Sequence, residues 1–315
     1  MIIKILDKGA IGNDTPLEIL STLGEVIVYD STDEKEIFER VCDADVLVFN
    51  KVKITKDVIE SAKSLKLLCV FATGYDNIDL EAAKANGVAV CNVPAYSTES
   101  VTLFTIATVT ALITNLREYS DFVRSGKYSS SGLPNRITPV YHEIAGKTWG
   151  IIGYGNIGKS VAKVAEALGA KVIVARNNNK GAEIERTISE LCMESDIITV
   201  HCPLTEKTRG VINESTIAQM KPGVILVNEA RGAVLNENDV KDAVLSGKIA
   251  AFGCDVYSKE PFPAEHPYSA IKELPNVILT PHAAWASYEA RKRCTEIIKS
   301  NIEAFFAGER KNRIV

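Results

Sequence analysis

Three polar residues in the last third of the chain supply the groups that reduction of a ketone requires. Arg231 follows an apolar run, Glu260 stands before a proline, and His282 follows another proline. A guanidinium can hold a carboxylate at two points and polarise an adjacent ketone. An imidazole can protonate the alkoxide that hydride addition creates, and a carboxylate beside it fixes its tautomer. We therefore predict that Arg231, Glu260 and His282 form a catalytic set.

Each of the three also has an ordinary structural interpretation. Arg231 alone would serve as an ion-pair partner, Glu260 as a loop carboxylate and His282 as a hydrogen-bonded core histidine. Their shared position favours chemistry, because each comes soon after an apolar run that is typical of a parallel strand. The carboxyl ends of such strands line one edge of an open sheet, and ligands bind at that edge.

A glycine motif earlier in the chain predicts a dinucleotide site. Gly153-Tyr154-Gly155-Asn156-Ile157-Gly158 follows the apolar run 148–152 and begins a helix-length segment. The first glycine permits a tight turn, the second lets the backbone approach a pyrophosphate, and the third lets helix and strand touch. The alternative is a plain turn between a strand and a helix. We predict that Gly153, Gly155, Asn156, Ile157 and Gly158 contact a nicotinamide dinucleotide.

The residues after the next strand favour NADP over NAD. An acidic side chain about 20 residues beyond the glycines usually holds the adenosine ribose of NAD. Here the strand 171–175 ends at Arg176, and no carboxylate occurs from Lys171 to Ala182, whereas Lys180 adds a cation. These charges suit the 2′-phosphate of NADP. The alternative is that Arg176 is a solvated residue at the end of a strand and that NAD is the cofactor.

The spacing of the apolar runs predicts two α/β domains, each with a parallel sheet. Short runs alternate with helix-length segments over the first hundred residues, and a second series begins at residue 148. The stretch 101–116 predicts a buried helix, and 287–307 a helix that packs back on the first domain. We assign 1–98 plus 287–315 to a substrate-binding, catalytic domain and 99–286 to a dinucleotide-binding domain, with the active site in the cleft between them.

Composition excludes several kinds of partner. The formal net charge is −4 with dispersed Lys and Arg, so we expect no nucleic-acid binding. The seven cysteines and four histidines show no metal-ligand spacing, so we expect buried thiols and no metal. The chain starts on an apolar run without a charged leader, and no run has the length that spans a bilayer. We expect a cytoplasmic protein that does not enter membranes.

The motifs together resemble those of the D-isomer-specific 2-hydroxyacid dehydrogenases. The likeness covers nearly the whole chain, and it rests on the glycine motif, Ala72-Thr73-Gly74-Tyr75-Asp76-Asn77-Ile78-Asp79, Asn92-Val93-Pro94, Asn228-Glu229-Ala230-Arg231-Gly232, Asp255-Val256 through Glu260-Pro261, and Thr280-Pro281-His282. The resemblance implies two Rossmann-like or flavodoxin-like domains with parallel sheets. It also implies hydride transfer between NAD(P)H and a small 2-oxo acid.

The same resemblance implies roles for individual residues. Arg231 would bind the substrate carboxylate and carbonyl, His282 would be the acid/base, and Glu260 would pair with His282. Thr73 and Gly74 would grip the substrate carboxylate through backbone N–H groups, with a plain turn as the alternative. Asp255 would meet the nicotinamide carboxamide. The other cofactor contacts that we predict are Arg176, Cys202, Pro203, Thr208, Glu229 and Ala230, together with Arg231 and His282. His201 is given no catalytic role.

Within the family, the segments 94–98 and 282–291 are most similar to glycerate dehydrogenases, also called hydroxypyruvate reductases. Hydroxypyruvate or glyoxylate is therefore the expected substrate, with D-lactate and D-3-phosphoglycerate dehydrogenases as alternatives. Two departures from the family's pattern, Thr102-Leu103-Phe104 and a segment 132–139 without aromatic residues, bear on substrate preference.

Two expectations concern partners. The helix at 101–116 resembles a subunit-crossing helix of the family, so we expect a homodimer, with a core helix as the alternative. An interpretation of another class is a dinucleotide-sensing corepressor on the same fold. The retained Arg231, Glu260 and His282 argue against it.

Overall fold

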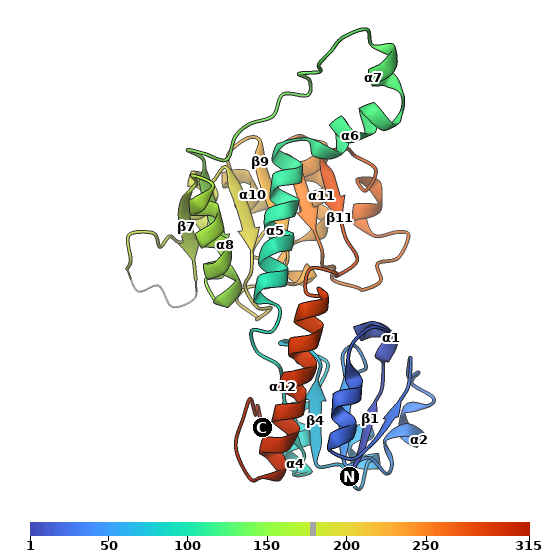
Figure 1. Cartoon of the computed structure of the whole chain (residues 1–315). Helices are drawn as coiled ribbons and strands as arrows, with labels where there is room; N and C mark the ends of the chain where they lie inside the picture. Colours follow the sequence, from blue (N-terminus) through green and yellow to red (C-terminus); the bar gives the residue numbers. More distant parts are fainter. Residues whose placement is uncertain (177–180) are drawn as a thin grey trace. The chain divides into compact units, whose positions relative to one another are not determined.

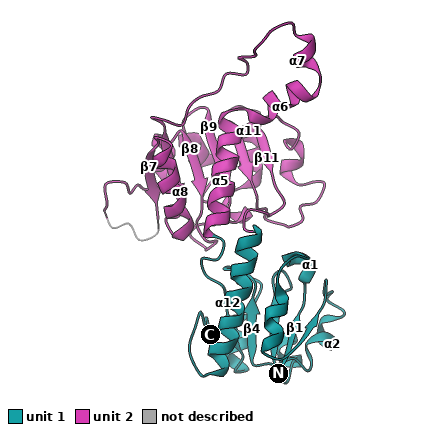
Figure 2. Cartoon of the chain, viewed as in Figure 1, with its two compact units in different colours: residues 1–97, 286–315 teal, residues 98–285 magenta. Residues whose placement is uncertain are grey.

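The chain folds into two compact units, and each is described by itself. The computed structural model describes residues 1–176 and 181–315. One unit comprises Met1–Ser97 with Ala286–Val315, and the other comprises Thr98–Trp285 (Figure 2). Lys180, which the cofactor argument counted as a cation, lies outside the described residues.

The first unit is built on a parallel sheet, in which Figure 1 labels β1 and β4. Its strands stand in the order β2-β1-β3-β4-β5. Its strands are β1 (Ile2–Ile5), β2 (Glu25–Val28), β3 (Val46–Phe49), β4 (Leu67–Val70) and β5 (Ala89–Cys91). Its helices are α1 (Lys8–Ile11), the 3-10 helix η1 (Leu17–Thr22), α2 (Ile37–Val41), α3 (Lys56–Ser61), α4 (Leu80–Ala85) and α12 (Tyr288–Phe306).

The second unit is built on a parallel sheet in the order β11-β10-β9-β8-β6-β7. Its strands are β6 (Thr148–Ile152), β7 (Lys171–Ala175), β8 (Ile197–Val200), β9 (Val224–Asn228), β10 (Ile249–Cys254) and β11 (Val277–Leu279). Its helices are α5 (Thr98–Ile113), α6 (Leu116–Arg124), α7 (Lys127–Ser130), α8 (Asn156–Ala167), α9 (Ile188–Glu194), α10 (Glu214–Gln219), η2 (Gly232–Val234), α11 (Glu237–Leu245) and η3 (Pro267–Ala270). The predicted class, two α/β units with parallel sheets, is confirmed.

Successive side chains of a strand point to opposite sides of the sheet, and in the second sheet both sides are covered by helices and buried. Leu226 and Phe252 pack on the face that α10 and α11 cover. Trp149 and Val227 pack on the other face, with Leu112 of α5. The strand order switches direction at β6, because β7 pairs on one side of β6 and β8 pairs on the other. In open α/β sheets the ligand crevice opens at such a point.

The helix predicted at 101–116 is α5, which begins and ends three residues earlier, and a second helix follows it after a sharp bend. α5 ends at Ile113, and Asn115 has φ 52°, a left-handed conformation that asparagine tolerates better than most residues. α6 starts at Leu116, at 66° to α5. Within the described chain, no single helix is both long and apolar enough to cross a membrane, and the bent pair passes on length and composition only when taken together.

The C-terminal helix shows how its sequence sets its place. Ser287 accepts a hydrogen bond from Ala290 N, which caps the start of α12. Cys294, Ile298 and Ile302 recur every four residues and are fully buried. This stripe packs against β4 and η1, so the last segment of the chain belongs to the first unit. All seven cysteines are free thiols, and Cys42, contrary to expectation, is exposed.

Candidate active site

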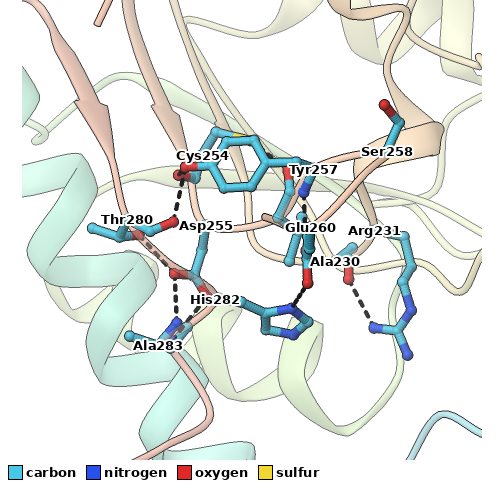
Figure 3. A network of polar contacts seen from close by, with 12 residues as sticks. Ala230, Arg231, Cys254, Asp255, Tyr257, Ser258, Glu260, Thr280, His282 and Ala283 are labelled. Atoms are coloured by element: carbon cyan, nitrogen blue, oxygen red, sulfur yellow. Dashed lines mark hydrogen bonds and ion pairs between the residues drawn. The ribbon is translucent and has the colours of Figure 1, made fainter. Parts of the chain in front are cut away.

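The imidazole of His282 and the carboxylate of Glu260 are in direct contact (Figure 3). Nδ1 of His282 lies 2.6 Å from Oε2 of Glu260, and the two side chains are 25% and 26% exposed. A carboxylate only accepts hydrogen bonds, so ionised Glu260 fixes the proton on Nδ1 and leaves Nε2 to exchange a proton with a ligand. The structure thus brings together two of the three residues that the sequence placed in one catalytic set.

Backbone hydrogen bonds hold His282 and Glu260 in place. His282 has φ 54°, a strained region for a residue with a side chain and one that is found at functional sites. Its backbone N donates to Asp255 O at 2.8 Å, which ties the segment after β11 to the end of β10. Tyr257 N donates to Glu260 Oε1 at 3.1 Å, and the Tyr257 hydroxyl donates to Thr280 O at 2.8 Å. The two loops that carry the pair are therefore joined to each other.

Asp255 is a buried carboxylate with a complete set of donors. It is 1% exposed and accepts hydrogen bonds from Thr280 Oγ1 at 2.7 Å, Ala283 N at 2.8 Å and Ala284 N at 2.9 Å. Hydrogen bonds to charged groups contribute about 1.5–3 kcal/mol each. In the structure this carboxylate fixes the backbone on both sides of His282.

Arg231 follows β9 in a turn that its neighbours hold. Asn228 is fully buried; its Nδ2 donates to Arg231 O at 3.0 Å, and its Oδ1 accepts from Ala230 N at 3.1 Å. The Arg231 guanidinium donates to Ala230 O at 2.9 Å. Arg231 and His282 extend to the same side of the network in Figure 3.

Gly232 lets the Arg231 turn touch the loop that carries Glu260. A Cβ at this position would lie 1.9 Å from the carbonyl carbon of Tyr257 and 2.2 Å from Ser258 N. From the sequence alone, a glycine beside Arg231 is typical of a position where a ligand approaches the backbone closely. The structure corrects that interpretation, because protein backbone takes the space.

The three glycines of the motif meet different surroundings. Gly153 has φ 98°, and a Cβ there would lie 2.5 Å from Cys202 N, so it permits both the turn and the approach of β8. A Cβ on Gly158 would lie 2.1 Å from Gly153 O, so this glycine lets α8 pack on the turn. A Cβ on Gly155, the N-cap of α8, would meet nothing within 4 Å. The N-terminus of α8 therefore faces open space, which suits the pyrophosphate of a dinucleotide.

The comparisons with known proteins identify the family. The family profile described as D-isomer specific 2-hydroxyacid dehydrogenase, NAD binding domain, matches residues 106–284. A hydroxypyruvate reductase from Blautia hydrogenotrophica is 39% identical, with 98% of each chain covered. The chain belongs to the D-isomer specific 2-hydroxyacid dehydrogenase family. A glycerate dehydrogenase from Methylorubrum extorquens is 38% identical over 90% of each chain. A solved acyclic imino acid reductase with NADPH and D-Arg is 30% identical, with a TM-score of 0.87 and 100% of both chains covered.

As a D-2-hydroxyacid dehydrogenase, the protein is an oxidoreductase of CH–OH donors that binds NAD(P). The open N-terminus of α8 fits such a cofactor. Among the residues described, no three His, Cys, Asp or Glu side chains form a group that could hold a metal ion.

The structure changes the argument about cofactor preference. An Nη2 of Arg176 forms an ion pair with Oε1 of Glu185, whose side chain is 3% exposed. Glu185 forms a parallel bridge with Val174, so it lies beside the end of β7. The segment 171–182, which has no carboxylate, ends three residues before Glu185. The carboxylate of Glu185 therefore balances the positive charge of Arg176.

The other predicted contacts lie in two turns. After β8, the Thr208 hydroxyl donates to Pro203 O at 2.7 Å and accepts from Thr205 N at 2.8 Å, which closes the turn that begins at Cys202. After β4, in the first unit, the Thr73 hydroxyl donates to Val93 O at 2.8 Å and fixes the turn that contains Gly74. Both turns are held by their own side chains.

Sequence reasoning missed the residues that anchor the loop of Glu260. Glu237, at the start of α11, accepts from Ser258 N at 2.8 Å and lies 3.0 Å from Nε2 of His266. The side chains of His266 and Glu237 are only 4% and 10% exposed. A glutamate in the first turn of a helix is an ordinary feature, so the sequence carried no signal of this pair.

Proposed function

We propose that this dehydrogenase reduces hydroxypyruvate or glyoxylate to the corresponding 2-hydroxy acid with NADPH or NADH. The observation that carries the proposal is the 2.6 Å contact between His282 Nδ1 and Glu260 Oε2 at the ligand edge of the glycine-loop sheet. The names of the relatives, hydroxypyruvate reductase and glycerate dehydrogenase, support this substrate class. D-lactate and D-3-phosphoglycerate remain the alternative substrate classes.

In this proposal each residue acts on one part of the substrate. The cofactor supplies a hydride to the carbonyl carbon. Arg231 holds the carboxylate and polarises the ketone, and Thr73 and Gly74 bind the same carboxylate through backbone N–H groups. Nε2 of His282 protonates the new alkoxide, and Glu260 stabilises the imidazolium through Nδ1.

The proposal also assigns the two units. The chain 1–98 with 287–315 binds the substrate, and 99–286 binds the dinucleotide. The open N-terminus of α8 supports the second assignment. Cys202, Pro203 and Thr208 bind the adenine side, while Glu229, Ala230 and Asp255 lie on the nicotinamide side.

The choice between NADP and NAD depends on Arg176 in this proposal. Its guanidinium binds the 2′-phosphate of NADP if the phosphate displaces Glu185, and Glu185 accepts the ribose hydroxyls of NAD if the pair stays closed. An Arg176→Ala variant should lose about tenfold or more in NADPH affinity and keep its NADH affinity if NADP is the cofactor. Equal losses for both cofactors would exclude this role.

A homodimer and a cytoplasmic location complete the proposal. The arm formed by α6, α7 and the segment after them exposes the apolar side chains of Leu116, Leu133, Ile137 and Val140, which are 59–79% exposed. Exposed apolar groups of this size support an interface with a second copy. Sedimentation of the protein and of an Ile137→Asp variant tests this part, and a monomeric wild type would overturn it. The free thiols support a reducing compartment.

The experiment that tests the activity follows oxidation of NADPH and of NADH with a panel of 2-oxo acids. We expect the highest kcat/KM with hydroxypyruvate or glyoxylate, and lower values with pyruvate and 3-phosphohydroxypyruvate. A higher kcat/KM with one of the last two would replace the substrate. No turnover with any acid, despite cofactor binding, would favour the corepressor-like interpretation.

A further inference from the structure

Three polar residues stand in one row at the carboxyl edge of the second sheet. Asn228, the last residue of β9, pairs with Val200 of β8 and with Cys254 of β10. The next residue on each strand is polar, and the row consists of His201, Glu229 and Asp255. Their backbone N–H groups continue the ladder, since Glu229 N donates to Val200 O and Asp255 N donates to Asn228 O.

The side chain of Glu229 points to the face that α5 covers. Val227, two residues earlier, packs with Leu112 of α5, and alternate residues of a strand share a face. The Thr108 hydroxyl of α5 is close enough to lower the pKa of Glu229. Glu229 is 8% exposed, and among the described residues neither of its carboxyl oxygens has a hydrogen-bond partner of good geometry.

The surroundings favour the neutral form of this carboxyl. Burial, and then the charge of Asp255, raise the pKa of Glu229 to about 9, against the smaller effect of Thr108. His201 stands on the other side, and burial lowers the pKa of its imidazole to about 3, so it brings no positive charge. Burial keeps the thiol of Cys254 neutral by raising its pKa. The Arg231 guanidinium donates to the carbonyl of Ala230.

We propose that Glu229 distinguishes the oxidised from the reduced nicotinamide cofactor by charge. The inference rests on the proposed function, which puts the nicotinamide at this edge. The reduced ring is neutral and is bound while Glu229 keeps its proton. The oxidised ring is positive, and its binding drives Glu229–COOH to Glu229–COO⁻ with release of one H⁺ to the solvent. No other bond forms or breaks.

The proposal fixes the sign of a pH dependence. An opposite charge within about 4–6 Å lowers a carboxyl pKa by about 1–3 pH units. Because the oxidised cofactor then prefers the ionised carboxyl, its affinity must rise with pH between the lowered pKa and about 9. The affinity of the reduced cofactor should change little over the same range.

The test measures protons released on binding, without turnover. NAD⁺ or NADH is added to the intact protein at pH 8 in weak buffer with an indicator dye, and Kd is measured by fluorescence at pH 7, 8 and 9. If the pKa falls by about 2 pH units, about 0.8 proton per bound NAD⁺ is released, and Kd falls about 25-fold from pH 7 to pH 9. NADP⁺ and NADPH serve equally, because their 2′-phosphates cancel in the comparison.

Two variants isolate the carboxyl. Glu229→Gln keeps the size and polarity of the side chain but cannot ionise, so NAD⁺ should bind without that proton and with a nearly flat pH profile. Asp196→Asn removes a carboxylate at the opposite edge of the same sheet, where Asp196 accepts from Thr148 N, and should behave as the wild type. In infrared difference spectra, wild type should lose a protonated carboxyl band on NAD⁺ addition, and Glu229→Gln should not.

Two outcomes would overturn the proposal. If wild type and Glu229→Gln release the same number of protons with NAD⁺, the role of Glu229 is wrong while the proposed function stands. If neither protein binds any nicotinamide cofactor, the proposed function fails and the inference fails with it.

Discussion

The carboxyl edge of the second sheet has two halves, and their polar groups differ in whether they have hydrogen-bond partners. At the end of β10 and β11, the carboxylate of Asp255 accepts three hydrogen bonds and His282 pairs with Glu260. At the end of β8 and β9, as far as the described residues reach, neither ring nitrogen of His201 and neither carboxyl oxygen of Glu229 has a partner of good geometry. The two carboxyl groups stand on adjacent strands.

The first half is a site whose hydrogen bonds are complete, whereas the polar groups of the second half lack partners until a charged ligand binds. The first half is preorganised, so its groups need no rearrangement when a substrate arrives. The second half gives up stability, because a buried polar group without a partner costs about 1–3 kcal/mol. Proteins tolerate such conflicts mainly at functional sites. Substitutions in either half test this difference.

A substitution of His282, in the hydrogen-bonded half, should have the largest effect on the rate of the reaction. His282→Asn removes the proton donor, and we expect kcat to fall by about 10²–10⁴-fold, because that is what general acid catalysis contributes. Steady-state rates measure the loss, and fluorescence titration should show that cofactor affinity changes far less than kcat. Glu260→Gln, which keeps the contact but not the charge, should lose less. Rates near wild type for His282→Asn would remove His282 from the mechanism.

A pair of glycine substitutions tests whether the two loops of the complete half must touch. In Gly232→Ala the new Cβ would lie 1.9 Å from the Tyr257 carbonyl carbon, so the loops must separate. A misplacement of about 1 Å can cost about 10²-fold in rate. Gly155→Ala meets nothing within 4 Å, so we expect wild-type thermal stability and weaker cofactor binding only. An active Gly232→Ala enzyme would contradict this account of loop positioning.

The sequence predicted the groups whose signals are local. Apolar runs marked the strands, as in the fully buried β4 (Leu67–Val70). The glycine motif needs only its own spacing and the strand before it. The contact of His282 with Glu260 was expected because both follow neighbouring strands of a parallel sheet. These features depend on residues that are close in sequence or on the general rule for sheet edges.

The sequence did not predict how buried polar groups are paired. Glu185 reaches Arg176 through a strand bridge, and Glu237 reaches His266 across 29 residues. Glu229 was interpreted only as one of several cofactor contacts. Its burial and its lack of partners depend on which face of β9 it occupies and on the covering helix, and both are properties of the tertiary fold.

Neutralising each of the two neighbouring carboxyls should change stability in opposite directions. Asp255→Asn weakens three hydrogen bonds to a charged group, and we expect the free energy of unfolding at pH 8 to fall by about 2–3 kcal/mol. The raised pKa of Glu229 means that its favourable contribution is complete below about pH 4.5 and is lost as pH rises toward about 9. Glu229→Gln escapes that loss and should be more stable than wild type at pH 8.

Urea unfolding followed by tryptophan fluorescence measures both changes, since Trp149 and Trp285 both lie in the second unit. The Glu229→Gln gain should shrink at pH 5, where the wild-type carboxyl is protonated when folded and about one quarter protonated when unfolded. A loss of stability for both variants at pH 8 would show that the two carboxyls are equally satisfied, and the comparison between the two halves would fail.

His201 offers the smallest and most selective test of the unsatisfied half. Its imidazole stays neutral because burial lowers the pKa from 6.5 to about 3, whereas the unfolded chain takes up a proton below about pH 6.5. The folded state therefore loses about 2 kcal/mol of stability between pH 7 and pH 5 through this one residue. His201→Gln should remove that part of the acid sensitivity, and His142→Gln, at an exposed position, should leave it unchanged. Because a neutral imidazole brings no charge to its neighbour in the row, the same variant should leave proton release on NAD⁺ binding as in wild type. A changed proton count would mean that His201 and Glu229 titrate as a pair.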